Sequence, residues 1–247
     1  MSALLYLDSA YQTHFEATVL GTGPEGVELD RTLFYPEGGG QPHDEGWLSA
    51  ADGARWRVNR VSKSSGTVRH QLEPGPSPVD GLAVRGTVDW ARRHRNMRYH
   101  TAVHLLSGAA FARFGSDITG SQIASTGARL DLALPEARRE TAEELIREAN
   151  LQVEAARRVE VRWVDAAELE RTPSLVRVRR DLVPPGERLR LIDIVGFDVQ
   201  ADGGTHVRST AEVGPIRLDR FENKGARNKR LYVQLEERAP TPPDDPD

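Results

Sequence analysis

The chain has 247 residues, of which 38% are hydrophobic and 28% charged, with a formal net charge of −4. This composition indicates a soluble globular protein of one or two domains and argues against non-specific coating of nucleic acid. There is no cysteine, which excludes disulfides, a thiol nucleophile and thiolate metal ligands. We find no signal peptide and no apolar run long enough for a bilayer, and we expect a cytoplasmic protein without a membrane partner.

Residues 1–88 have the pattern of a small antiparallel β-barrel. Short β-branched and aromatic segments recur at roughly ten-residue spacing, with turn sequences between them. The expected strands are His14–Leu20, Gly26–Leu29, Thr32–Tyr35, Arg55–Val61, Thr67–Leu72 and Leu82–Val88.

A glycine triplet, Gly38–Gly40, interrupts this β pattern. Consecutive glycines suit a backbone that adopts positive φ or approaches another surface closely. The triplet fits either a wide flexible turn or a loop pressed against RNA or an active-site mouth, and the residues leave both alternatives open.

Residues 89–238 mix helices and strands without regular βαβ alternation, which predicts an α+β domain. A helix is expected from Trp90 to about Phe114, and a capping-box sequence at Thr141–Glu144 predicts the start of a second. Residues 239–247 are rich in proline and acid, so we expect a disordered tail. The other predicted elements are a short helix over Ala166–Arg171 and strands at Ile118–Ile123, Arg129–Leu132, Val159–Val164, Arg190–Val195, Glu212–Leu218 and Lys229–Leu235.

Two pairs of potential metal ligands stand out in this second domain. His100 and His104 lie four residues apart on the predicted helix, which places their Cβ atoms about 5–6 Å apart on one face. Asp202 and His206 have the same spacing, but the intervening Gly203 and Gly204 favour a loop. Together the pairs predict a four-ligand metal site. The alternative is a carboxylate that caps a turn and histidines that are satisfied by the backbone.

The absence of several known catalytic motifs limits the reactions expected of this chain. A zincin peptidase needs a glutamate after the first histidine, where this chain has Thr101, and there is neither a Gly-x-Ser-x-Gly elbow nor a Walker loop. A metal held by imidazole and carboxylate would activate water and polarise a carbonyl, which is ester or amide hydrolysis. Closed four-ligand sites are usually structural. The site must therefore expand to five ligands or release one, and the sequence leaves both open.

The metal motifs resemble those of the editing domain of alanyl-tRNA synthetase and of its free-standing relatives, the AlaX proteins. The resemblance extends in order over residues 10–236, through Thr32–Gln41, Val88-Asp-Trp90 and Thr210–Gly214. The family's second motif usually begins with cysteine, and here Asp202 takes that place. The resemblance implies Zn²⁺ as cofactor, although an oxygen ligand weakens the preference for zinc over other divalent ions.

The resemblance also implies an aminoacyl-tRNA deacylase that hydrolyses the ester of mischarged tRNA(Ala), with Ser-tRNA(Ala) as substrate and Gly-tRNA(Ala) as a second one. The expected substrate-binding residues are Thr119, Ser121, Gln122, Gly203, Gly204 and Thr205. The expected phosphate contacts are Arg92, Arg93, Arg95, Arg98, Lys224, Arg227, Lys229 and Arg230. Two alternatives remain: a tRNA-binding module that has lost catalysis, and a metal-dependent hydrolase of another small ester or amide.

Overall fold

The computed structural model divides the chain into two compact units, Met1–Asn96 with Ala239–Asp247, and Met97–Arg238. The two are described separately below. Within the described residues, no helix is long and apolar enough to cross a membrane. The structure describes residues 2–116, 118–124, 126–134, 138–165, 168, 171, 188–225 and 228–244.

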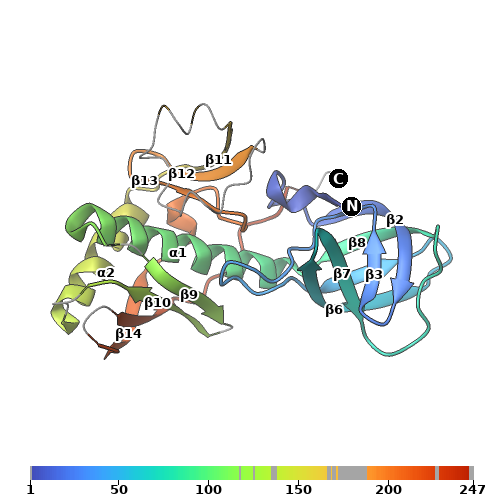
Figure 1. Cartoon of the computed structure of the whole chain (residues 1–247), viewed down its shortest axis with the longest axis horizontal. Helices are drawn as coiled ribbons and strands as arrows, with labels where there is room; N and C mark the ends of the chain where they lie inside the picture. The colour runs from blue at the N-terminus through green and yellow to red at the C-terminus, as the bar shows by residue number, and fades with distance from the viewer. Residues whose placement is uncertain are drawn as a thin grey trace. The chain divides into compact units, whose positions relative to one another are not determined.

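The first unit is built on a closed antiparallel barrel, as expected (Figure 1). Alternate strand residues such as Phe15 and Leu48 point inward, and Phe34 from the segment after β4 joins their core, all at most 6% exposed. In hydrogen-bonded order the strands are β2 (His14–Gly23), β3 (Gly26–Leu29), β7 (Thr67–Leu72), β6 (Arg55–Ser64), β5 (Gly46–Ser49) and β8 (Ala83–Val88). Outside the barrel lie the 3₁₀ turn η1 (Leu5–Leu7) and the short parallel pair β1 (Ala3–Leu4) and β4 (Arg31–Thr32).

The glycine triplet forms a tight turn. Gly38 and Gln41 exchange backbone hydrogen bonds of 3.2 and 2.8 Å, and the two residues between them, Gly39 and Gly40, have φ of 58° and 84°. Two consecutive left-handed residues are what a two-residue hairpin turn requires, and glycine adopts them without steric cost. The Tyr35 hydroxyl donates to the Gly38 carbonyl at 2.9 Å. The triplet is therefore a defined turn.

A buried ion pair anchors the base of this glycine-rich segment. Arg93 and Asp44 are both 0% exposed, with the guanidinium Nε 2.9 Å from the carboxylate. Arg93 also donates to the carbonyls of Ala10 and Leu33, while Asp44 accepts the backbone N–H of Tyr35 at 2.6 Å. Removing one partner of such a pair costs about 3–5 kcal/mol. Arg93 is thus an internal anchor of the first unit.

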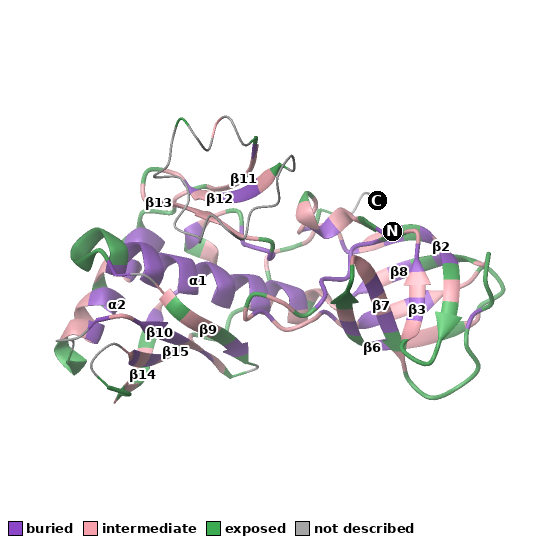
Figure 2. Cartoon of the chain, in the orientation of Figure 1, coloured by how far each residue is buried: buried purple, intermediate pink, exposed green. Residues whose placement is uncertain are grey.

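The second unit places a long helix among two sheets and a second helix (Figure 1). Much of this long helix, α1 (Trp90–Phe114), is buried (Figure 2). A four-stranded antiparallel sheet has the order β14 (Ile216–Asn223), β15 (Lys229–Leu235), β10 (Gly127–Leu132), β9 (Ile118–Ala124), and a three-stranded sheet has the order β11 (Val159–Val164), β12 (Leu189–Ile194), β13 (Asp198–Ala201). The remaining elements are α2 (Arg139–Glu154) and the 3₁₀ turn η4 (Thr210–Glu212).

The α+β class is confirmed, but several predicted details are corrected. The predicted strand Thr32–Tyr35 is absent, because β4 ends at Thr32. Helix α2 begins at Arg139, so Thr141 is at its third position, where its hydroxyl accepts the N–H of Arg138 at 3.3 Å. The strand expected from Glu212 begins at Ile216, after η4. The predicted short helix Ala166–Arg171 lies, except for residues 168 and 171, outside the described residues.

Residues 239–244 of the predicted disordered tail contact the first unit. The Trp90 indole donates to the Thr241 carbonyl at 2.7 Å, and the Asp244 N–H donates to the Tyr11 carbonyl at 3.0 Å. Both contacts use backbone atoms of the tail, which composition does not reveal. The segment therefore belongs to the first unit.

Because of His70, we predict that the stability of the barrel decreases in acid. The side chain is 0% exposed. Its Nδ1 donates to the Val27 carbonyl at 2.9 Å, and its Nε2 lies 2.9 Å from the Thr32 hydroxyl. Burial lowers the pKa of His70 from the ordinary 6.5 to about 4. Between those two values the unfolded chain binds more protons. The free energy of unfolding should therefore fall as pH drops from 6.5 to 4, by about 3 kcal/mol from this group.

The measurement is urea unfolding of the wild type and of the non-titrating His70→Gln variant across that pH range. The variant should lose less stability on acidification, since all other groups are common to both proteins. Equal pH slopes would contradict the prediction.

Candidate metal centre

Four side chains from distant parts of the chain converge in the second unit. His100 and His104 lie on α1, Asp202 directly follows β13, and His206 lies four residues further on. One potential ligand atom from each lies within 4.8 Å of all the others. The imidazole ring centroids of His206 are 4.3 Å from His100 and 4.6 Å from His104. The predicted pairs therefore do form one cluster.

Asp202 sits against two of the imidazoles. Its carboxylate oxygens are 3.1 Å from Nε2 of His206 and 3.6 Å from Nε2 of His100. The loop is held to β12, because the Asp202 N–H donates to the Arg190 carbonyl and the Arg190 guanidinium donates back to the Asp202 carbonyl at 2.8 Å. The Gly204 N–H donates to the Asp202 carboxylate, which closes the Gly203-Gly204 bend. The two glycines thus allow the loop to turn back on its own carboxylate.

Solvent reaches the cluster on the side of Asp202. The three histidines are between 3% and 6% exposed, whereas the Asp202 side chain is 15% exposed. The carboxylate side is therefore the most exposed part of the cluster.

Thr101 holds the far side of the His206 ring. Its hydroxyl is 3.1 Å from Nδ1 of His206 and accepts the Val207 N–H at 3.3 Å, and the residue is 0% exposed. When Nε2 serves as a metal ligand, Nδ1 carries the proton and donates it to the Thr101 oxygen. Such a partner fixes both the tautomer and the orientation of a ligating imidazole. The residue that excludes a zincin mechanism is thus part of the support for the cluster.

The protonation states of the cluster fit a divalent cation. Burial lowers the pKa of His100, and burial together with the neighbouring His100 lowers the pKa of His206 to about 4. Burial by itself would raise the pKa of Asp202, but the adjacent His100, the hydrogen bond from His206 and the charges of His206 and His104 hold it well below its usual range. Neutral imidazoles and an ionised carboxylate are the forms that bind metal.

Close packing at Gly108 sets the distance between α1 and the loop-bearing sheet. A Cβ at this position would lie 2.6 Å from the Phe197 ring and 3.1 Å from Asp198, where β13 begins. Glycine is unfavourable inside a helix by about 1 kcal/mol relative to alanine, yet a larger residue would push the two elements apart. Gly108 therefore brings β13, and with it Asp202, close to the two histidines of α1.

Comparisons with known proteins identify the family. Residues 189–232 match the model described as "Threonyl and Alanyl tRNA synthetase second additional domain", and residues 6–92 match "tRNA synthetases class II (A)". The chain is 36% identical to the alanyl-tRNA editing protein AlaX-M of Saccharolobus solfataricus over 95% of this chain and 99% of the relative. The chain belongs to the AlaX-M family. The resemblance seen in the sequence is confirmed.

Other relatives agree with this assignment. AlaX-M of Methanosarcina mazei is 35% identical over 97% of this chain and 98% of the relative. Alanine–tRNA ligase of Pyrococcus furiosus is 38% identical over 88% of this chain, which corresponds to only 24% of the ligase. The matched segment of the synthetase thus corresponds to parts of both compact units of this chain.

The predicted substrate residues of β9 do not share a face. Ser121 pairs with the buried Leu130, and Gln122 pairs with Arg129 on the opposite face of the sheet. The register shifts where Ile118 pairs with Leu132 and Gly120 with Asp131, so Thr119 is an extra residue in a bulge. Gln122 therefore lies on the opposite face of the sheet from Ser121, so the two cannot line one pocket together. Thr119, Ser121 and Gln122 stay predictions, as do Gly203, Gly204 and Thr205 of the ligand loop.

Three of the residues predicted to contact phosphate are buried and have partners within the protein. Arg93 pairs with Asp44, Arg98 donates to the carbonyls of Val213 and Glu236, and Lys229 donates to Asn223 and to the Gly225 carbonyl. The partners of Arg93 and Arg98 lie far away in sequence, which a run of basic letters does not show. Those of Lys229 lie four and six residues before it. Arg227 lies outside the described residues. The members with exposed or partly exposed side chains are Arg92, Arg95, Lys224 and Arg230.

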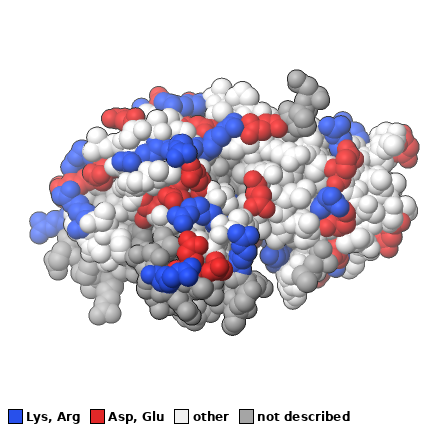
Figure 3. Space-filling view, turned by 90° about the horizontal axis from the view of Figure 1, so that it is seen from above, with Lys and Arg blue, Asp and Glu red and all other residues white. Residues whose placement is uncertain are grey.

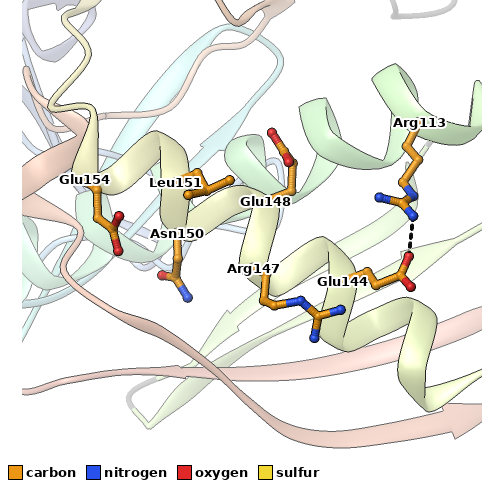
Figure 4. A pocket seen from close by; sticks show the side chains of 7 residues that line it. All are labelled: Arg113, Glu144, Arg147, Glu148, Asn150, Leu151 and Glu154. Carbon is orange, nitrogen blue, oxygen red and sulfur yellow. Dashed lines mark ion pairs between the residues drawn. The ribbon is translucent and has the colours of Figure 1, made fainter.

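A groove of about 570 Å³ beside α2 has no residue of the cluster (Figure 4). Its charged side chains include both signs, and Arg113 and Glu144 pair across it at 2.6 Å. More widely, positive and negative side chains are interleaved over the face shown in Figure 3. On such a face, RNA contacts would depend on individual side chains and not on a large basic patch.

Thr101 provides a test of the proposed support for His206. Replacement by valine keeps the shape but leaves Nδ1 of His206 and the Val207 N–H without an acceptor. We expect zinc affinity to fall by about 10–100-fold, as for other outer partners of metal ligands. Thr101→Ser keeps the hydroxyl and should retain near wild-type affinity. Chelator competition measures both, and equal affinities of the two variants would refute this role.

Asp202→Cys tests the ligand that distinguishes this chain from the usual family motif. A thiolate is softer than a carboxylate and prefers zinc over manganese. The variant should therefore raise the ratio of Zn²⁺ to Mn²⁺ affinity by about tenfold or more. Competition titration with both ions measures the ratio. An unchanged ratio would mean that residue 202 is not a ligand.

Proposed function

We propose that this protein hydrolyses the ester that joins a wrong amino acid to tRNA(Ala), with Zn²⁺ as cofactor and Ser-tRNA(Ala) as substrate. Gly-tRNA(Ala) is proposed as a second substrate. The proposal is supported most directly by the convergence of His100, His104, Asp202 and His206 in a member of an alanyl-tRNA editing family.

The cluster has the parts that ester hydrolysis requires. A divalent metal bound there supplies a polarised ester carbonyl and an activated water. The chain itself contributes three buried imidazoles that orient the ion and a partly exposed carboxylate. Thr101 keeps His206 in the orientation for ligation. The backbone of Gly203 and Gly204 borders the carboxylate and is our candidate for contacts to the aminoacyl end.

The need for a separate hydrolytic site follows from the limits of size discrimination. A pocket sized for alanine cannot exclude the smaller glycine, and one methyl group offers only about 1–3 kcal/mol of selectivity. A hydrolytic site can instead form a hydrogen bond with the serine hydroxyl, which alanine lacks. Thr119 and Ser121 supply hydroxyls for this purpose, and the bulge at Thr119 re-aims that part of β9.

The alternative of a tRNA-binding module without catalysis was motivated by aspartate in place of the usual cysteine. Asp202 lies 3.1 Å from Nε2 of His206, its side chain is 15% exposed, and the neighbouring histidines hold its pKa well below the usual range, all of which support a role as a ligand. These features favour the catalytic proposal over the binding module.

Deacylation of Ser-tRNA(Ala) tests the function. The purified protein should release serine well above the uncatalysed rate, and His104→Ala should lower this activity by at least about 100-fold because a ligand is lost. Affinity for uncharged tRNA(Ala) should stay within about twofold in that variant, since His104 is 6% exposed. Absence of serine release by the wild type would refute the proposal and leave the binding module. Equal activity on a small seryl ester without RNA would point to the general esterase.

A further inference from the structure

The four-stranded sheet has one polar face that neither the metal centre nor the fold explains. Its other face is buried, with Leu130, Leu231 and Val233 at most 1% exposed. On the polar face the strand register aligns one residue from each strand in a row. This row, which we call the cross-sheet row, consists of Arg220, Tyr232, Arg129 and Gln122.

A pocket of about 300 Å³ opens over this row. Gln122, Arg129 and Tyr232 line it, together with Gln234, Asp219 and the backbone around Gly127. Its walls thus combine an aromatic ring, a guanidinium and two primary amides. Amides and guanidinium groups offer donors and acceptors to the edge of a planar heterocycle, and the ring offers a surface for stacking.

Arg129 lines this pocket with a side chain that is 31% exposed. Its Nε is buried and has no hydrogen-bond partner among the described residues. An oxygen of the Asp131 carboxylate is 3.9 Å away, and that carboxylate is held by Arg230 through two bonds of 2.7 and 3.0 Å. The Arg129 guanidinium is therefore not neutralised by a close ion pair, and its exposed part can reach a ligand in the pocket.

Tyr232 is already arranged as a stacking platform. The Arg220 guanidinium lies 4.0 Å from its ring centroid, and Arg220 is itself held by Glu222 at 2.9 Å. A guanidinium stacked on an aromatic ring extends the planar surface and adds positive charge. Nearby, Arg230 of β15 pairs with Asp131 at 2.7 Å, and Lys224, just after the end of β14, pairs with Glu222 at 2.8 Å. The cross-sheet row therefore offers a planar surface that combines an aromatic ring with the guanidinium groups of Arg220 and Arg129.

We propose that the cross-sheet row and its pocket bind an unpaired nucleotide of the RNA partner. The base stacks on the Tyr232–Arg220 surface, Gln122 and Gln234 contact its edge, and Arg129 donates to a phosphate or carbonyl oxygen. Recognition of single-stranded RNA by aromatic and arginine planes on a four-stranded sheet has this chemistry. This proposal rests on the proposed function, because it takes tRNA as the partner, but it uses no residue of the metal centre.

The test is fluorescence anisotropy of the full-length protein with uncharged tRNA(Ala). Tyr232→Leu removes the ring and Arg129→Gln removes the charge, and each should weaken binding by about tenfold. Tyr232→Phe keeps the ring and should bind like the wild type. Arg147→Gln is the charge-matched control, because it removes an exposed cation in the separate groove beside α2 (Figure 4).

Salt dependence separates the two contributions. Arg129→Gln should reduce the slope of log affinity against log salt concentration by about 0.7–0.9, the value for one phosphate contact. Tyr232→Leu should leave the slope unchanged. The proposal is overturned if Tyr232→Leu and Arg129→Gln bind no more weakly than Arg147→Gln.

Failure of this proposal is distinguishable from failure of the proposed function, because uncharged tRNA requires no deacylation. A protein that releases no serine but shows these losses of affinity would refute the reaction and support the RNA site. A protein that deacylates Ser-tRNA(Ala) while all four variants bind alike would refute the RNA site alone.

Discussion

The contact between one ionised carboxylate and buried imidazoles is the interaction on which the second unit depends. Asp202 lies within 3.6 Å of two of the ring nitrogens, in surroundings where an uncompensated charge would be costly. The helix, the ligand loop and β12 all act to keep these groups together. Gly108 brings the elements close, Arg190 ties the loop to its sheet, and Thr101 orients the ring of His206.

Replacement of the family's usual cysteine by aspartate is compatible with this arrangement. The carboxylate supplies a negative charge where a thiolate would, and its second oxygen remains available to the Gly204 N–H and to solvent. The harder ligand should widen the range of ions that bind. The rest of the site, with three imidazoles in a largely buried setting, remains one that suits zinc.

Sequence reasoning succeeded where a pattern is local or tied to a familiar motif. The spacing of His100 and His104 specifies one helix face, and β-branched and aromatic segments separated by turn sequences located most barrel strands. The reasoning failed where a long-range partner decides the role of a residue. Arg93 and Arg98 belong to a basic run, yet each is buried against acceptors far away in the chain. Gln122 follows Ser121 directly, and only the strand register shows that they face opposite ways. The short strands β5 and β13 lacked a pattern long enough to detect.

The most direct test of the account is removal and restoration of the metal. The protein is stripped of metal with a chelator, and serine release from Ser-tRNA(Ala) is followed as Zn²⁺ is added back. We predict no release above the uncatalysed rate without metal and full recovery at about one equivalent of Zn²⁺ per chain, as expected for a single four-ligand site. Full activity of the metal-free protein would contradict the claim that these four side chains form a catalytic metal centre.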